Sequence, residues 1–221
     1  EGLTSIGQSA FYNSTVKEIV TPSTLRHLSE QAFYNAKNLE IITLPESLET
    51  LPNGCFLHCE SLSSIMLPQS LKVLGNEAFY YCPALTEITL PEGLEEIGKY
   101  AFLNTGITEL TIPNSCTKFH VSGMDNLTTL TLPAGLTELP KGGFGGMRSL
   151  VSVTLPAGIT DIPQRAFWGC TSLKSLTIPE GVKSIGEAAF MESGIESIVI
   201  PESVEKIDDN TFKGCPNLES I

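Results

Sequence analysis

Three stretches of the sequence are near copies of one another: LPEGLEEIGKYAF at residues 90–102, LPAGITDIPQRAF at residues 155–167 and IPEGVKSIGEAAF at residues 178–190. Each copy opens with an apolar residue and Pro, continues to an Ile, and closes on Ala-Phe. Recurrence of this kind is typical of repeat architectures, in which every copy forms one structural unit. The fold is therefore encoded in the repeat rather than in any single segment.

Phenylalanine sets the period of the repeat. Nine of the ten Phe residues stand 22 or 23 residues apart, except across one gap of 42: Phe11, Phe33, Phe56, Phe79, Phe102, Phe144, Phe167, Phe190 and Phe212. Prolines keep the same spacing and show that the gap contains one shortened, irregular copy at residues 113–132. The sequence predicts a single solenoid of about ten turns over residues 1–221. Because it starts and stops inside a unit, we expect it to be a segment of a longer protein.

The segment LTEITLP, residues 85–91, alternates apolar and polar side chains. This alternation predicts a half-buried strand, and copies one period apart can stack as a parallel sheet. Pro ends each strand because it donates no ladder hydrogen bond, and Ser or Gly follows at a tight corner. The small residue before each spine Phe, Ala in most copies, leaves room for the ring, so we expect the rings to stack inside the coil as a spine.

The full consensus, L-x-x-I-x-L-P-x-(S/G)-L-x-x-I-(G/P)-x-x-A-F, runs along essentially the whole chain. In this it resembles the BspA-like leucine-rich repeats of bacterial surface proteins. The resemblance implies a right-handed coil with a parallel β-sheet on its concave face and little α-helix. It also implies a secreted or cell-surface location in a bacterium and an adhesive role.

Composition and motif content argue against several classes of function. The net charge is -12 and the 13 Lys and Arg residues are scattered, so no basic stripe for nucleic acid is present. No apolar run approaches the about 18 residues of a membrane-spanning helix. The three histidines, His27, His58 and His120, fall in different columns of the repeat, and no nucleophile, base and orienting partner come together. We expect no enzyme, no cofactor and no metal site.

Cysteine also follows the repeat. Four of the six Cys residues occupy the column three residues after the spine Phe: Cys59, Cys82, Cys170 and Cys215. Other copies place Ser, Ala, Thr or Met there, so these residues read as small buried groups with free thiols. The Cys spacing matches no zinc motif.

Two columns of the repeat are candidates for a binding surface. The outward position of the predicted strand carries Thr in most copies, and the position two residues earlier carries Glu in some of them; the candidates are Thr43, Thr89, Thr111, Thr131, Thr154, Thr177, Glu87 and Glu109. Thr also has high strand propensity, so a purely structural reason for this column stays open. The residue after the spine Phe forms a second column, here called the ridge, with Tyr80 and Trp168 as candidates. Packing between turns would also explain these aromatic residues.

The sequence and the resemblance together favour a non-catalytic recognition or adhesion module that binds a host protein or glycoprotein. Two alternatives remain at this point: a passive spacer that holds another domain, and a module that binds glycans. The ends lack polar capping units, so end-to-end self-association is also open. The irregular copy is either a tolerated deletion or a functional notch that contains His120.

Overall fold

The computed structural model describes residues 2–221, which contain fifteen short strands and no helix. The chain divides into two compact units, residues 1–121 and residues 122–221, and the division falls inside the irregular copy. Each unit is a parallel β-solenoid. The spine Phe residues mark about nine turns in all, close to the predicted ten.

The first ladder of each unit is built from the strand that the sequence predicts before each Pro. In unit 1 the strands β2, β4 and β6 pair in parallel and β9 lies further along the chain; their bounds are Glu18–Val20, Ile41–Thr43, Ser64–Met66 and Glu109–Thr111. In unit 2, β11 (Thr129–Thr131) pairs with β12 (Ser152–Val153). Single bridges join Ser175 to Ser197 and Ser197 to Ser220. The outward side chains of this ladder form what we call the strand face.

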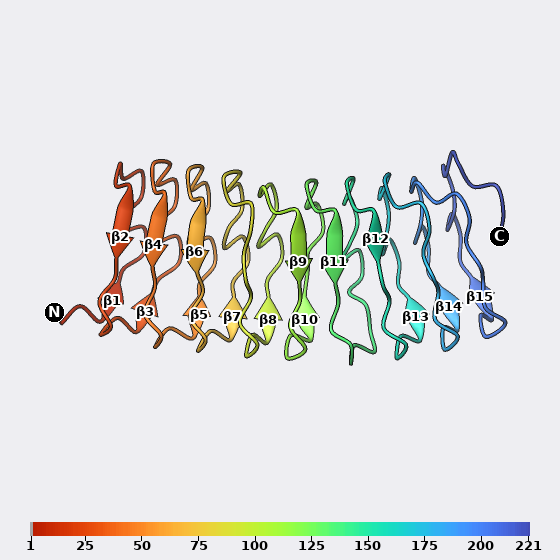
Figure 1. Cartoon of the computed structure of the whole chain (residues 1–221), viewed down its shortest axis with the longest axis horizontal. Coiled ribbons are helices and arrows are strands. Elements are labelled where there is room, and N and C mark those ends of the chain that lie inside the picture. Colours follow the sequence, from red (N-terminus) through yellow and green to blue (C-terminus); the bar gives the residue numbers. More distant parts are fainter. Residues whose placement is uncertain (1) are drawn as a thin grey trace. The chain divides into compact units, whose positions relative to one another are not determined.

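A second parallel ladder, which was not predicted from the sequence, lies on the return path of most turns. Figure 1 shows the two ladders of unit 1 as two rows of arrows. Every strand of the second ladder has two residues, and each except β15 places a buried side chain at its second position. The strands are β1 (Ser5–Ile6), β3 (His27–Leu28), β5 (Thr50–Leu51), β7 (Val73–Leu74), β8 (Glu96–Ile97) and β10 (Lys118–Phe119) in unit 1, and β13 (Asp161–Ile162), β14 (Ser184–Ile185) and β15 (Lys206–Ile207) in unit 2.

The core of each unit is the predicted Phe spine. In unit 1 the ring centroids of successive spine residues lie 5.1 to 5.8 Å apart, with planes tilted by 18° or less. In unit 2 the corresponding distances are 5.3 to 5.6 Å. Burial of one such ring contributes about 2 kcal/mol to stability. The prediction of an internal stack is confirmed.

The backbone beside the spine is also bonded from turn to turn. The amide of Phe56 donates to the carbonyl of Ala78 at 2.8 Å, and the amide of Phe79 donates to that of Ala101 at 2.8 Å. On either side of the Ala-Phe pair, residues adopt left-handed conformations, such as Glu77 and Tyr81 with φ of 57°. These two residues bend the chain sharply enough to point the intervening Phe inward.

The irregular copy keeps its place in the second ladder. Phe119 pairs in register with Ile97, and its ring is buried. Val121 and Met124 are buried as well. Apolar side chains therefore continue through residues 113–132 although the Ala-Phe pair is missing.

Candidate functional site

The strand face carries the Thr side chains that the sequence singled out. Thr43, Thr89, Thr111, Thr131, Thr154 and Thr177 are all exposed, because the alternation of the strand turns the flanking residues inward. The pairing register of β2, β4 and β6 confirms that the Thr position forms one column. Thr43 stands opposite Val20 on one side and Met66 on the other. Glu87 and Glu109 are exposed two residues before Thr89 and Thr111.

Unit 1 has a groove on this face, which we call the acidic groove. Its volume is about 720 Å³, and it is lined by residues of three successive turns, Ser64, Ile65, Met66, Leu67, Gln69, Glu87, Ile88, Thr89, Leu90, Glu92, Glu109, Thr111 and Pro113. Four of the predicted site residues, Thr89, Thr111, Glu87 and Glu109, therefore come together here. The groove coincides with an interruption of the first ladder, because residues 87–89 form no strand in the described chain.

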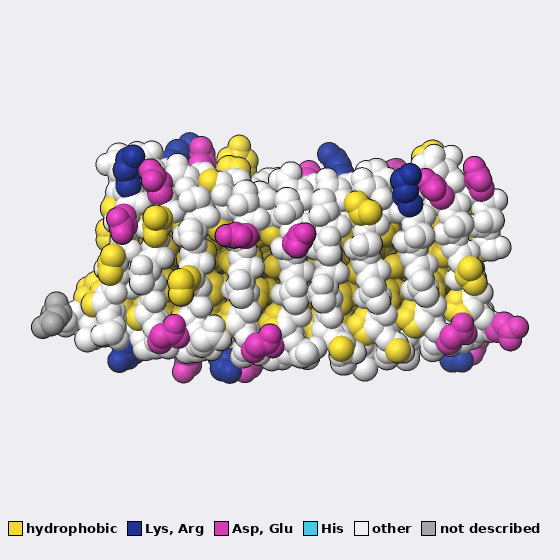
Figure 2. All heavy atoms as spheres, in the orientation of Figure 1, with side chains coloured by type: hydrophobic (Ala, Val, Ile, Leu, Met, Phe, Trp, Pro, Cys, Tyr) yellow, Lys and Arg dark blue, Asp and Glu magenta, His cyan; other side chains and the backbone are white. Residues whose placement is uncertain are grey.

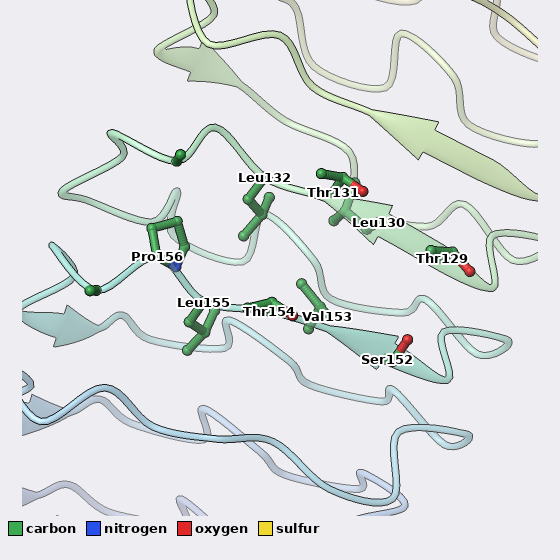
Figure 3. A pocket seen from close by; sticks show the side chains of 11 residues that line it. Thr129, Leu130, Thr131, Leu132, Ser152, Val153, Thr154, Leu155 and Pro156 are labelled. Atoms are coloured by element: carbon green, nitrogen blue, oxygen red, sulfur yellow. The ribbon is translucent and has the colours of Figure 1, made fainter.

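Unit 2 has a smaller and uncharged groove on its own strand face. It has a volume of about 470 Å³ and contains the predicted residues Thr131 and Thr154. Figure 3 shows Thr129 and Thr131 on β11 beside Ser152 and Thr154 of the next turn, with Leu132, Leu155 and Pro156 at one end. No carboxylate lines this groove among residues 2–221. Its hydroxyl and methyl groups can donate, accept or pack, but they supply no fixed charge.

The ridge carries the two predicted aromatic residues in different settings. Tyr80 is half-buried, and its ring centroid lies 5.8 Å from that of His58, which in turn lies 4.8 Å from Tyr81. Trp168 is 41% exposed. The indole of Trp168 lies beside Gly145, since a Cβ added at Gly145 would be in ordinary van der Waals contact with it at 3.7 Å. Packing between turns thus accounts for most of Tyr80, while much of Trp168 faces solvent.

Histidine and cysteine residues are dispersed along both units. Burial, and to a lesser extent the charge of Lys99, lowers the pKa of His120, whose ring lies 6.0 Å from that of Tyr100. All six cysteines are free thiols and all but Cys215 are buried. In the part of the chain that the structure describes, no three His, Cys, Asp or Glu side chains are placed to hold a metal ion.

The predicted thiol column forms a regular set of contacts. The Sγ atoms of Cys59, Cys82 and Cys170 each donate to the carbonyl of the spine Phe one turn earlier, at distances of 3.1 to 3.2 Å. Burial raises the pKa of Cys59 and of Cys170 to about 12. These thiols are therefore protonated structural groups at neutral pH and cannot act as nucleophiles.

The outward Thr column also carries apolar residues, to which the sequence assigned no role. Met66 is 82% exposed and Val20 is 71% exposed, although both occupy the Thr column. Ile88 is half-buried, whereas its counterparts Ile65 and Leu110 are buried. The signal was present in the sequence, since Val and Met interrupt a column of Thr, but alternation alone does not reveal how far Ile88 is exposed.

Comparison with known proteins identifies the repeat. A family model described as the BspA type leucine rich repeat region, in 6 copies, matches residues 4–124 and 121–219. The chain belongs to the BspA-type leucine-rich repeat family. The family expected from the consensus is thereby confirmed. None of the curated proteins compared with this BspA-type chain matches it.

Solved structures of bacterial leucine-rich repeat proteins share the BspA-type fold. One from Bacteroides ovatus is 32% identical with a TM-score of 0.71, covering 99% of this chain and 52% of that protein. One from Eubacterium ventriosum is 26% identical with a TM-score of 0.69, covering 95% of this chain and 67% of the other. The T. pallidum leucine rich repeat protein is 26% identical with a TM-score of 0.62, covering 80% of this chain and 76% of the other. The BspA-type chain thus spans about half the length of the Bacteroides ovatus protein.

The family assignment describes a repeat scaffold, and no enzyme family accompanies it. No helix within residues 2–221 is long and apolar enough to cross a membrane. What the BspA-type units offer chemically is therefore a surface: a groove on the strand face of each unit, exposed apolar side chains in both units, and an exposed indole in unit 2.

Proposed function

We propose that the chain is a non-catalytic recognition or adhesion module, secreted or displayed on a bacterial cell surface. It binds a host protein or glycoprotein through the strand face. Membership of the BspA-type family supports this role, and the grouping of Thr89, Thr111, Glu87 and Glu109 in one groove carries it. A passive spacer has no need for a hollowed face with exposed apolar side chains such as Met66, because exposed apolar surface favours association.

A second candidate is glycan binding at the ridge. Trp168 favours it, since an indole that is 41% exposed can stack on a sugar ring. The two candidates use different surfaces, because Trp168 follows a spine Phe and does not lie on the strand face.

An array of purified extracellular proteins and glycoproteins, each also present in enzymatically deglycosylated form, tests these roles. The wild-type chain is expected to bind at least one protein. The variant Thr89→Lys/Thr111→Lys should lose this binding, because two bulky charged side chains then occupy the acidic groove. The variant Thr50→Lys/Thr117→Lys is the matched control, since both residues are exposed in unit 1 but lie outside the groove.

The outcomes separate the candidates. Binding that is lost on deglycosylation and in Trp168→Ala, but kept in Thr89→Lys/Thr111→Lys, would replace the strand-face role with glycan binding. Absence of binding to every protein on the array would favour the passive spacer and contradict recognition.

A further inference from the structure

The acidic groove gathers carboxylates that have no ion-pair partner. Three other acidic side chains of unit 1 do pair with a lysine one turn away, in Lys17–Glu40 at 3.1 Å, Lys37–Glu60 at 2.8 Å and Lys72–Glu95 at 3.6 Å. Glu87, Glu92 and Glu109 form no ion pair among the described residues. The negative charge of the groove is therefore uncompensated within the chain.

Two of these carboxylates, Glu87 and Glu109, occupy the same column in successive turns. Both are exposed and line the same groove, so a cation bound there meets two negative charges. The column thus favours a partner that brings positive charge.

Apolar side chains border the same charges. Met66, which is 82% exposed, lines the groove together with the half-buried Ile88 and with Pro113. Val20 and Ile41 extend this apolar surface over the neighbouring strands β2 and β4. In Figure 2 the visible Lys and Arg side chains lie at the edges of the face, hydrophobic side chains lie along its middle, and acidic side chains occur in both places.

Unit 2 provides an internal comparison. Its groove is built from the same two columns, but the Glu positions are taken by Thr129 and Ser152, and the Met position by Thr154. Of the two grooves, only that of unit 1 therefore combines unpaired carboxylates with an exposed Met side chain.

We infer that the acidic groove binds an extended peptide segment in which Lys or Arg alternates with apolar residues. This inference rests on the proposed recognition function and specifies its partner. The groove crosses three turns, a span of about 10 Å, which an extended chain covers with about three or four residues. The cationic side chains of the segment contact Glu87 and Glu109, and its apolar side chains contact Met66 and Ile88.

Fluorescence anisotropy of labelled peptides tests the inference directly. The probe is a peptide of about eight residues in which Leu and Lys alternate, and its two controls alternate Leu with Glu and Ser with Lys. The expected result is saturable binding of the Leu/Lys peptide, weaker binding of the Ser/Lys peptide and none of the Leu/Glu peptide. Binding should weaken as the salt concentration rises from about 50 mM to about 300 mM.

Variants assign the binding to the groove. Glu87→Gln/Glu109→Gln should weaken binding of the Leu/Lys peptide by about tenfold, since two exposed ion pairs are lost. Glu180→Gln/Glu202→Gln removes the same charge from exposed positions of unit 2 and should leave affinity unchanged. Met66→Ser should weaken the Leu/Lys peptide but not the Ser/Lys peptide.

Equal loss in both double Glu variants would show attraction to net charge alone and overturn the inference. Equal binding of the Leu/Lys and Ser/Lys peptides would overturn its apolar part. If no peptide binds while Thr89→Lys/Thr111→Lys still abolishes capture on the protein array, the cationic partner is wrong and the recognition function stands. If peptide binding is lost in Glu87→Gln/Glu109→Gln but no array protein is captured, the groove is a peptide site and the proposed adhesive role is wrong.

Discussion

Phe79 and Phe102, one turn apart in unit 1, lie with their ring planes 2° from parallel and their centroids 5.8 Å apart. Both rings are buried, and the amide of Phe79 donates to the carbonyl of Ala101 in the next turn. The strand face depends on this stack, because the rings set the spacing at which successive turns present their outward side chains.

Loss of one ring from the middle of the spine should destabilise unit 1 strongly. Phe79→Ala leaves a cavity between Phe56 and Phe102 and should lower the free energy of unfolding by about 3 to 5 kcal/mol. Phe79→Leu keeps most of the volume and should cost clearly less. Urea denaturation followed by circular dichroism measures both variants, and a loss below about 1 kcal/mol in Phe79→Ala would contradict a packed spine.

Gly106 is required by the short turn in which it stands. This turn has 22 residues, and a Cβ at position 106 would lie 2.5 Å from the carbonyl oxygen of Pro83. Gly106→Ala forces the backbone apart and should destabilise the chain by about 2 kcal/mol or more. Gly135→Ala is the control, because nothing lies within 4 Å of its added Cβ, and it should be neutral or slightly stabilising. Similar thermal midpoints for the two variants would refute the steric argument.

The buried thiols make the free energy of unfolding vary with pH in the alkaline range. Burial raises the pKa of Cys59 and of Cys170 from 9.0 to about 12, so above pH 9 the unfolded chain loses protons that the folded chain keeps. The contribution of these thiols to the free energy of unfolding is therefore constant below pH 9. It falls as the pH rises toward 12, by up to about 1.4 kcal/mol per pH unit for each thiol.

The double variant Cys59→Ala/Cys170→Ala isolates this effect from the titration of lysine. Its free energy of unfolding should fall less steeply between pH 9 and pH 11 than that of the wild type, whatever its value at neutral pH. Parallel pH profiles for the two proteins would show that these thiols are not buried as described.

The single tryptophan reports on the ridge. Because Trp168 is 41% exposed and rests against Gly145, its fluorescence should be quenched by acrylamide to a degree between that of a buried and that of a free indole. Gly145→Val should displace the ring and increase the quenching. An unquenched signal in the wild type would place the indole in the core and remove glycan stacking as a candidate.

Much of the fold follows from the sequence because the spine residues recur in fixed register. Phe33, Phe56 and Phe79 can only meet if turns of 22 or 23 residues stack, and the alternation around Ile42 and Ile65 then fixes the first ladder. The second ladder was not predicted, since two-residue strands such as Glu96–Ile97 are too short to show a period of two.

The candidate site was predicted less completely. The columns of Thr89 and Thr111 were recognised because position in the repeat determines which side chains point outward. The interruption at residues 87–89 was not, because LTEITLP has the same alternation as the copies that do pair. Backbone spacing between turns decides whether a bridge forms, and the alternation of side chains does not encode that spacing. For the same reason, the sequence did not reveal that Ile88 is only half-buried, and it did not reveal the groove.

Hydrogen–deuterium exchange of the chain with and without an extracellular protein captured on the array tests recognition through the strand face most directly. The account predicts slower exchange at residues 64–66, 87–89 and 109–111, with residues 27–28, 50–51 and 73–74 of the second ladder unchanged. Protection confined to the second ladder or to the ridge around Trp168, or no protection by any protein on the array, would contradict it.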